Sequence, residues 1–485
     1  MLTLKDQGLL REAGLIGGEW VAATSGERLA VTDPATTEPF GQVPAMGADE
    51  TEQAIAAAER AFGPWRALPA AARAAKLAAW HDLMMAHQAD LAMIMTAEQG
   101  KPLAEARGEI AYGASFVKWF AEEARRIGGS TIPAPTPDRR VLVLREPVGV
   151  CSIITPWNFP NAMITRKVAP ALAAGCTVVI KPSELTPFSA LALGVLAERA
   201  GIPPGVINIV TGLPAEIGRA LTQSPVVRKI SFTGSTRVGS HLMRESAGTI
   251  KRLSLELGGN APFIIFDDAD LDAAVEGAIV SKFRNGGQTC VCSNRILVQS
   301  GVYDAFAEKL SARVQAMRVG PGTEEGVAVG PMINAAACEK IARHVEDARA
   351  HGAKILASVS DIPQRGYFAR PMVLGEASTG MMLAQEETFG PVAPLFRFDS
   401  EAEAIEIANA TPFGLASYFY TENLKRAWRV GEALEFGMVG LNTGMVSMEV
   451  APFGGIKQSG LGREGAQCGI EEYLELKSFH IAGLG

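Results

Sequence analysis

The 485-residue sequence contains only six cysteines and six histidines. Six scattered cysteines in a chain of this length do not form a disulfide framework, so a reducing cytoplasm is the compartment that we expect. No CxxC motif, HExxH motif or histidine-rich cluster is present in the sequence. Because these are the usual spacings of zinc ligands, we predict no bound metal.

Positive charge and long apolar runs are also scarce. The formal net charge is −7 at pH 7, and the sequence has no basic stretch with interleaved aromatic residues, which argues against nucleic acid as a partner. No uninterrupted apolar run approaches the roughly 18 residues of a membrane span, and the first residues lack the basic and then apolar order of a signal peptide. We therefore expect a cytoplasmic protein with no membrane or nucleic-acid partner.

The composition is that of a large globular protein, with 48% hydrophobic and 20% charged residues in a chain too long for one ordinary core. Residues 1–50 are rich in turn formers, and residues 51–126 are mostly strong helix formers. Residues 140–145 predict an apolar strand that lies between two α/β segments. Such an isolated ribbon is a candidate subunit contact.

Strands and helices alternate from residue 148 onward. We predict strands at 148–154, 177–180, 206–210 and 229–232, with helices at 162–174, 188–200 and 215–221. This alternation is typical of right-handed βαβ units in a parallel sheet, whose ligands bind beyond the carboxyl ends of the strands. We therefore expect residues 155–159, residues 181–184, Gly212 and the Gly234-Ser235 pair to share one edge of the sheet. A second α/β stretch covers about residues 254–446.

Residues 283–290 read FRNGGQTC and place Cys290 behind two glycines and a glutamine. A thiol is strongly nucleophilic only as a thiolate, and histidine is its usual helper. The nearest histidines in the sequence, His241 and His344, are far from Cys290. A nucleophilic Cys290 would therefore depend on a carboxylate or on backbone amides, and a buried small hydrophobe is the alternative for an isolated cysteine.

Two further motifs supply partners for such a nucleophile. In PWNFP, the amide of Asn158 lies between bulky rings and prolines and suits a preorganised donor to an oxyanion. An Asx-turn is the alternative. In LELGGN, Glu256 lies among apolar residues, and desolvation raises a carboxyl pKa in the way that a general base acting on water requires. An ordinary acid at the end of a helix or strand is the alternative.

Two motifs next to predicted strands suit a dinucleotide. GSTRVG at 234–239 follows a strand and opens a helix, which favours anion binding at the helix N-terminus, although a plain tight turn is the alternative. In KPSE, Lys181 and Glu184 suit ribose hydroxyls. The carboxylate of Glu184 repels a 2′-phosphate and favours NAD, whereas Lys181 and Ser183 leave NADP open. A solvated loop pair is the alternative.

A last motif, QEETFGP, separates Glu387 from Phe389 by one residue. In an extended segment both side chains would point to the same side, as a cradle for a ribose and a nicotinamide requires. By itself the motif predicts only a turn.

Together these motifs resemble those of the aldehyde dehydrogenase superfamily. They occur in the same order as in that family, and the resemblance covers essentially the whole chain. The resemblance implies an α/β protein with a Rossmann-type parallel-sheet cofactor domain, an α/β catalytic domain and a small β oligomerisation domain. The dinucleotide-binding domain would comprise residues 1–125 and 145–255, and the catalytic domain residues 256–450. Residues 126–144 and 459–485 would be the oligomerisation elements.

The resemblance also implies the roles of individual residues. Cys290 would be the nucleophile, Glu256 the general base, and Asn158 with the backbone amide of Cys290 the oxyanion hole. The cofactor would be NAD, with NADP possible as well. The residues that would bind it are Thr155, Pro156, Trp157, Lys181, Ser183, Glu184, Gly212, Gly234, Ser235, Val238, Leu257, Glu387 and Phe389.

Within the superfamily, residues 162–167, 288–295 and 452–460 most closely resemble succinate-semialdehyde dehydrogenases. Arg284 lies six residues before the nucleophile, and Arg166 lies eight residues after the oxyanion donor. Two guanidinium groups near the substrate would clamp a distal carboxylate in bidentate fashion, with ion pairing inside the protein as the alternative. Ser447 is a third candidate for substrate binding, although its loop departs from these relatives at the next residue, a methionine.

We therefore expect an NAD(P)-dependent homo-oligomer, a dimer or a tetramer, that oxidises succinate semialdehyde to succinate through a cysteine thiohemiacetal and a thioester. Glutarate semialdehyde or another acid-bearing aldehyde is the nearest alternative, because one methylene discriminates by only about 1–3 kcal/mol. A cofactor-independent thiol esterase and a non-catalytic binding protein are alternatives from other classes. The Cys-Val-Cys spacing of Cys290 and Cys292 also suggests a small disulfide that oxidation forms and thiols reverse.

Overall fold

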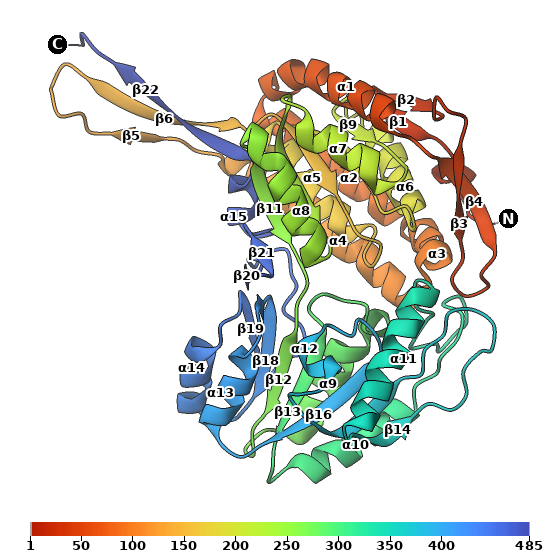
Figure 1. Ribbon diagram of the computed structural model, residues 1–485. Helices are drawn as coiled ribbons and strands as arrows, with labels where there is room; N and C mark the ends of the chain where they lie inside the picture. The colour runs from red at the N-terminus through yellow and green to blue at the C-terminus, as the bar shows by residue number, and fades with distance from the viewer. Residues whose placement is uncertain (1, 485) are drawn as a thin grey trace.

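The computed structural model describes residues 2–484, which form two large sheets covered by helices and a projecting arm (Figure 1). The first sheet has the strand order β2-β1-β9-β8-β7-β10-β11-β21. Its strands are β1 (Gly14–Ile16), β2 (Glu19–Val21), β7 (Val150–Ile154), β8 (Thr177–Lys181), β9 (Ile207–Ile209), β10 (Val227–Thr233), β11 (Arg252–Glu256) and β21 (Gly460–Leu461). The strands from β7 to β11 run parallel, as the alternating sequence pattern predicts.

The helices that connect these parallel strands are close to those predicted from the sequence. They are α5 (Ala162–Ala174), α6 (Pro187–Arg199), α7 (Pro214–Gln223) and α8 (Thr236–Ser246). The bounds of α5 agree with the prediction because the apolar run stops at Gly175, whose φ of 102° suits a left-handed helix cap. Every residue of α5 is buried, which explains why it carries few of the polar residues expected of a surface helix.

The helix-rich segment after residue 47 folds as four helices, not as one continuous run. They are α1 (Ala48–Ala67), α2 (Ala70–Ala86), α3 (Gln88–Gln99) and α4 (Leu103–Glu123). Pro69 precedes α2, and Pro102 precedes α4, where a missing N–H is tolerated. Gly100, with a φ of 85°, ends α3.

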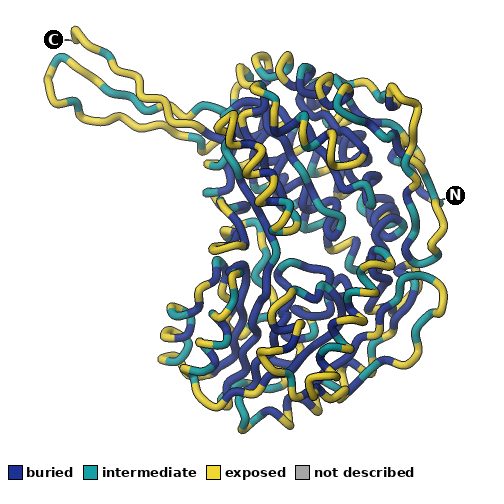
Figure 2. The backbone as a smooth tube through the Cα atoms, in the orientation of Figure 1, coloured by how far each residue is buried: buried dark blue, intermediate teal, exposed yellow. Residues whose placement is uncertain are grey.

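The second sheet has the strand order β14-β15-β16-β13-β12-β18-β19. Its strands are β12 (Ala261–Ile265), β13 (Ser293–Gln299), β14 (Lys354–Ser358), β15 (Met372–Ala377), β16 (Val392–Phe398), β18 (Ala416–Tyr420) and β19 (Met438–Leu441). The accompanying helices are α9 (Leu271–Phe283), α10 (Tyr303–Gln315), α11 (Ala335–Ala350), α12 (Met382–Gln385), α13 (Glu401–Asn409) and α14 (Leu424–Ala433). Figure 2 shows that buried backbone is concentrated in the bodies around the two sheets.

The arm is a separate antiparallel sheet of β5 (Ser130–Ile132), β6 (Arg140–Pro147) and β22 (Leu474–Ile481). It extends away from both bodies and is largely exposed (Figures 1 and 2). The C-terminal segment contributes to two sheets, because β21 pairs with β11 before the chain reaches β22.

The two large sheets meet where the chain crosses from one to the other. β11 ends at Glu256, and β12 begins at Ala261 in the second sheet. Because β7, β8, β10 and β11 are parallel, their carboxyl ends all reach this side of the first sheet. The residues predicted to bind ligand after these strands are therefore brought to the junction of the two bodies.

Within residues 2–484, no helix is long and apolar enough to cross a membrane. In the same part of the chain, no three His, Cys, Asp or Glu side chains gather in a way that could hold a metal ion.

Candidate active site

The loop that carries Cys290 leaves α9 through three consecutive left-handed residues. Asn285, Gly286 and Gly287 have φ values of 53°, 62° and 77°. Asparagine tolerates this conformation and glycine adopts it without steric cost. Gly287 also has no room for a side chain, because a Cβ there would lie 2.3 Å from the carbonyl oxygen of Gly390. The reversal turns the chain so that Cys290, half-buried, faces the junction of the two bodies.

Side chains from distant segments hold this loop in place. The backbone N–H of Asn285 donates to Oε2 of Glu105 on α4 at 2.7 Å. Gln288 accepts from the N–H of Ile333 at 2.9 Å and donates to the carbonyl of Asn285 at 3.0 Å. The buried amide of Asn158 donates to the carbonyl of Gln288 at 3.1 Å, which places the predicted oxyanion donor directly beside the loop.

A cavity of about 380 Å³ lies between the two bodies at this point. Of the residues predicted from the sequence, it is lined by Pro156, Trp157, Asn158, Gly234, Ser235, Leu257, Cys290, Glu387 and Phe389. The rings of Trp157 and Phe389 meet edge to face, with centroids 5.6 Å apart and an interplanar angle of 87°. An aromatic wall and a thiol therefore share one cavity, which suits a flat ring that must lie next to a reacting carbon.

The predicted extended segment around Glu387 and Phe389 is not extended. Phe389 has a φ of 55°, which is far from strand geometry. Both side chains nevertheless line the cavity. The nearby ammonium of Lys340 donates to the backbone carbonyl of Glu387 at 2.5 Å and so helps to hold the loop. Burial raises the pKa of the Glu387 carboxyl to about 7.

The start of α11 is a wall of the cavity that the sequence analysis missed. Ile333, Asn334, Ala336, Ala337 and Lys340 line the cavity from this helix. Asn334 caps the helix by accepting from the N–H of Ala337 at 3.0 Å. The asparagine before a helical segment was a visible N-cap signal. Nothing in the sequence indicated that this helix would begin opposite the strands of the first sheet.

Glu256 lies beside the cavity but not in its lining. It is the last residue of β11, and its side chain reaches toward Gly454, where a Cβ would lie 2.9 Å from Oε1. Both carboxyl oxygens are buried without a hydrogen-bond partner among residues 2–484. Burial, and then the neighbouring Glu464 carboxylate, raise the pKa of Glu256 well above its usual value. These are the surroundings that we predicted for a general base.

Arg166 is buried and paired within the protein. Its guanidinium forms an ion pair with Glu464, which also pairs with Lys167. The carbon at its centre lies 3.9 Å from the ring centroid of Phe453. Its Nη2 is buried and has no hydrogen-bond partner in the part of the chain that the structure describes. Arg166 therefore forms the ion pair inside the protein that was the alternative to substrate binding. One edge of its guanidinium still has free donors.

Arg284 is in different surroundings. It is half-buried, and its guanidinium carbon lies 5.4 Å from the ring centroid of Phe159, next to the oxyanion donor. No salt bridge joins it to a carboxylate within residues 2–484. Its positive charge lowers the Cys290 pKa, although less than burial raises it. The third substrate candidate, Ser447, is half-buried in the loop after β19 and does not line the cavity.

The remaining predicted cofactor residues lie along the same edge of the first sheet, outside the cavity that holds Cys290. Lys181 and Glu184 form an ion pair with a distance of 2.8 Å, and Ser183 accepts from the N–H of Leu185 at 3.2 Å. Gly212 packs against the backbone of residue 46, where a Cβ would lie 2.3 Å from a carbonyl oxygen.

Predicted residues also lie where β7 and β10 end, next to Thr233, the last residue of β10. Ser235 caps α8 by accepting from the N–H of Val238 at 3.4 Å. The hydroxyl oxygens of Thr155 and Thr233 are buried and find no hydrogen-bond partner in the described residues. Buried hydroxyls are normally hydrogen-bonded, so this edge fits the hydroxyls and phosphates of a dinucleotide.

The thiol of Cys290 is neutral in these surroundings. Burial is the main cause that raises its pKa, to about 12, and the carboxyls of Glu387 and Glu256 act in the same direction. The guanidinium groups of Arg166 and Arg284 oppose the shift. Further positive charge or hydrogen-bond donors near the sulfur would favour the thiolate.

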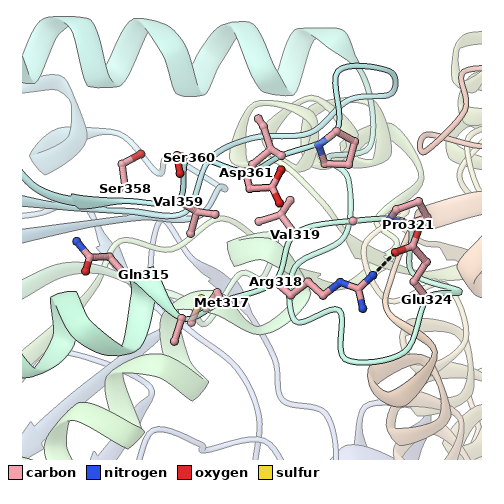
Figure 3. Close-up of a pocket in the computed structure, with 14 residues that line it drawn as sticks. Gln315, Met317, Arg318, Val319, Pro321, Glu324, Ser358, Val359, Ser360 and Asp361 are labelled. Carbon is pink, nitrogen blue, oxygen red and sulfur yellow. Dashed lines mark hydrogen bonds and ion pairs between the residues drawn. The ribbon is translucent and has the colours of Figure 1, made fainter.

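A second hollow, about 700 Å³ in volume, lies at the end of β14, an edge strand of the second sheet (Figure 3). It is lined by the segment after α10 and by residues 358–363. Arg318 in its wall forms an ion pair with Glu324 at 2.5 Å. Within residues 2–484, none of the predicted site residues lines this hollow, so it is not the site of the chemistry considered above.

The chain matches a known protein family and many known proteins. Residues 20–479 match the aldehyde dehydrogenase family. The chain is 60% identical over 481 residues to a glutarate-semialdehyde dehydrogenase of Pseudomonas putida, which covers 99% of this chain and 100% of the relative. It is 58% identical over 476 residues to an NADP(+) succinate-semialdehyde dehydrogenase of Escherichia coli (strain K12), with 98% and 99% covered. Among solved structures, an aldehyde dehydrogenase from Brucella melitensis biovar abortus 2308 superposes with a TM-score of 0.98, at 60% identity and 99% coverage of both chains.

The raised pKa of Cys290 predicts how the thiol reacts without cofactor. At pH 8 a thiol with a pKa of about 12 is roughly a thousandfold less ionised than one with a pKa of about 9. We expect carbamidomethylation of Cys290 by iodoacetamide to accelerate about tenfold per pH unit from pH 7 to pH 10. Mass spectrometry of the peptide measures the rate, and Cys290→Ser identifies the modified residue. A plateau near pH 9 would contradict the raised pKa.

Proposed function

Because the chain belongs to the aldehyde dehydrogenase family and is an NAD(P)-dependent oxidoreductase, we propose that it oxidises succinate semialdehyde to succinate. The observation that carries the proposal is Arg284, a half-buried cation without a salt bridge in residues 2–484, close enough to Cys290 to lower the pKa of its thiol. A short aldehyde with a carboxylate at its other end matches a thiol that has an unpaired guanidinium nearby. A plain aliphatic aldehyde has no use for the guanidinium.

The family confirms the predicted fold class and the predicted resemblance. It also excludes the two alternatives from other classes, a cofactor-independent thiol esterase and a non-catalytic binding protein.

In the reaction that we propose, the Cys290 thiol loses its proton to solvent and the thiolate sulfur attacks the aldehyde carbon, which moves the carbonyl electron pair onto oxygen. The side-chain amide of Asn158 and the backbone N–H of Cys290 then donate to the developing oxyanion. Removing one such donor typically costs about 3–4 kcal/mol of transition-state stabilisation. Nδ2 of Asn158 already donates one hydrogen to Gln288 and keeps a second for the oxyanion.

Glu256 then takes a proton from the water that hydrolyses the thioester on Cys290. Its raised pKa makes it a stronger base than an exposed carboxylate. Its carboxyl group lies beside Gly454, and its charge affects the Cys290 thiol, which supports its role at the sulfur.

The dinucleotide would lie along the edge formed by Lys181, Glu184 and the start of α8, with its ring near the aromatic wall of Trp157 and Phe389. When bound, it accepts the hydride of the aldehyde carbon. We propose NAD as the preferred form, because Glu184 repels a 2′-phosphate and accepts hydrogen bonds from a ribose diol. The Lys181 ammonium holds the pKa of Glu184 below its usual value against the opposing effect of burial, so the carboxylate is charged.

Glutarate semialdehyde is the second candidate substrate. The relative from Pseudomonas putida named for that substrate is 60% identical to this chain, against 58% for the relative named for succinate semialdehyde. One methylene group separates the two substrates and changes binding by about 1–3 kcal/mol. Initial rates on both aldehydes, with each cofactor, measure the preference directly.

We also infer that the protein assembles through its arm and works in a reducing compartment, the cytoplasm. Three apolar residues of the arm are exposed, with exposed fractions of 41% for Leu144, 72% for Leu476 and 51% for Phe479. Apolar side chains on a projecting sheet favour burial against a second copy. All six cysteines are free, which is usual in a reducing cytoplasm.

The carboxylate clamp predicts a selective defect. We expect Arg284→Ala to raise KM for succinate semialdehyde by about tenfold or more, because the bidentate charged contact is lost. KM for propanal, which has no carboxylate, changes much less. Steady-state rates of NADH formation measure both, with Arg318→Ala, which changes the wall of the distant hollow, as the control. Equal losses on the two aldehydes would refute the clamp.

Glu184 predicts the cofactor preference. We expect Glu184→Ser to raise kcat/KM with NADP relative to NAD by about tenfold or more, because a charge near the 2′-phosphate is removed and Lys181 is released. Glu245→Ser, at an exposed position on α8, is the matched control. An unchanged ratio of the two cofactors would show that Glu184 does not select between them.

Cys292 predicts reversible oxidation. Cys292 lies two residues beyond the half-buried Cys290, and its buried thiol donates to the carbonyl of Lys282 at 3.5 Å. We expect hydrogen peroxide to join the two thiols as a disulfide, with two molecules of water formed, and dithiothreitol to restore activity. The recovery is absent in Cys292→Ala. Recovery of that variant to the same extent as the unmodified protein would exclude the disulfide.

A further inference from the structure

The backbone carbonyl of Asn158 accepts a hydrogen bond from a buried ammonium group in another part of the chain. Lys101 lies between α3 and α4 and is 2% exposed. Its Nζ donates to the carbonyl oxygen of Asn158 at 2.9 Å and lies 3.9 Å from the ring centroid of Phe159. Burying an ammonium group is costly unless it is paired, so this lysine requires groups that stabilise it beside the carbonyl.

Glu109 on α4 pairs with this lysine and also holds the chain that follows Asn158. One carboxylate oxygen of Glu109 accepts from Lys101. The other accepts from the N–H groups of Asn161 at 3.0 Å and Ala162 at 3.2 Å. These two N–H groups are at the start of α5, where a carboxylate is favoured by the helix dipole. The segment from Asn158 to Ala162 is therefore held at both ends by one ion pair.

The loop of the nucleophile contacts the same carbonyl. Nδ2 of Asn285 donates to the carbonyl oxygen of Asn158 at 3.0 Å. A carbonyl oxygen has two lone pairs, and here Lys101 and Asn285 both donate to it. The peptide group of Asn158 is thus fixed between α4 and the loop that carries Cys290. Its Oδ1 is buried and has no partner in the described residues, so the side-chain amide is oriented mainly from its backbone and by Gln288.

We propose that Lys101 is a positioning residue for the oxyanion donor, acting through the backbone carbonyl of Asn158. This inference rests on the proposed function, in which the Asn158 amide stabilises the oxyanion. Lys101 itself does not line the cavity of Cys290. Its effect is to hold the amide at the place where negative charge develops, and displacements of about 1 Å at such a place cost about a hundredfold in rate.

Lys101→Met keeps the length of the side chain and removes its donor and its charge. We expect kcat to fall by about 10-fold to 100-fold on succinate semialdehyde and on propanal alike, because every aldehyde develops the same oxyanion. KM changes by less than about threefold, since the carboxylate contact at Arg284 is not altered. Lys118→Met, at an exposed position on the same helix as Glu109, is the control and keeps the full rate.

A double-mutant cycle with Asn158→Ala separates positioning from general support of the fold. If Lys101 acts through the Asn158 amide, Lys101→Met lowers kcat by less than about threefold once that amide is gone. Losses that multiply, so that the double variant is slower by the product of the two single effects, would overturn the proposal.

The two proposals fail in different ways. Asn158→Ala with an unchanged kcat would contradict the oxyanion role in the proposed function, whatever Lys101 does. Thermal unfolding of each variant shows whether it folds. If Lys101→Met does not fold, Glu109→Gln replaces it in the same cycle, because the neutral amide still accepts from the start of α5 and releases Lys101. The expected non-additivity and the overturning outcome are the same for that variant.

Discussion

The site depends on one constraint, the meeting of parallel strand ends with the loop that carries Cys290. β7 and β11 end at this junction, where Asn158 follows β7 and Glu256 is the last residue of β11. The loop can approach them because three left-handed residues reverse the chain after α9. The hydrogen bond from the Asn158 amide to Gln288 then joins the two bodies at the point where the chemistry is proposed.

Buried charge surrounds this junction and is balanced in two ways. The cations Arg166 and Lys167 share the carboxylate of Glu464, and Lys101 is matched by Glu109. Cys290 and Glu256 have no such partner, so burial raises the pKa of both. Burial of an unpartnered acid and an unpartnered thiol disfavours the charged form of each group.

Much of the first body could be predicted from local sequence. The helix at 162–174 has the predicted bounds, because the apolar run forms the helix and the glycine after the run ends it. The shared edge of the strands also follows from the alternating pattern, since parallel strands carry their loops at one end. The pairing of Arg166 with Glu464 could not be predicted in this way, because the two residues are 298 positions apart in the sequence and no periodicity connects them.

By itself, the sequence determined which chemical groups are present and on which element each lies: the thiol after two glycines, the amide between prolines, and the acid at a strand end. Tertiary structure alone decided their partners. It placed Lys340 and the start of α11 across the cavity, it directed Lys101 at the Asn158 carbonyl, and it turned Phe389 out of an extended conformation. The physical reason is that local propensity acts over a few residues, whereas burial and hydrogen bonding join any segments that the packed fold brings together.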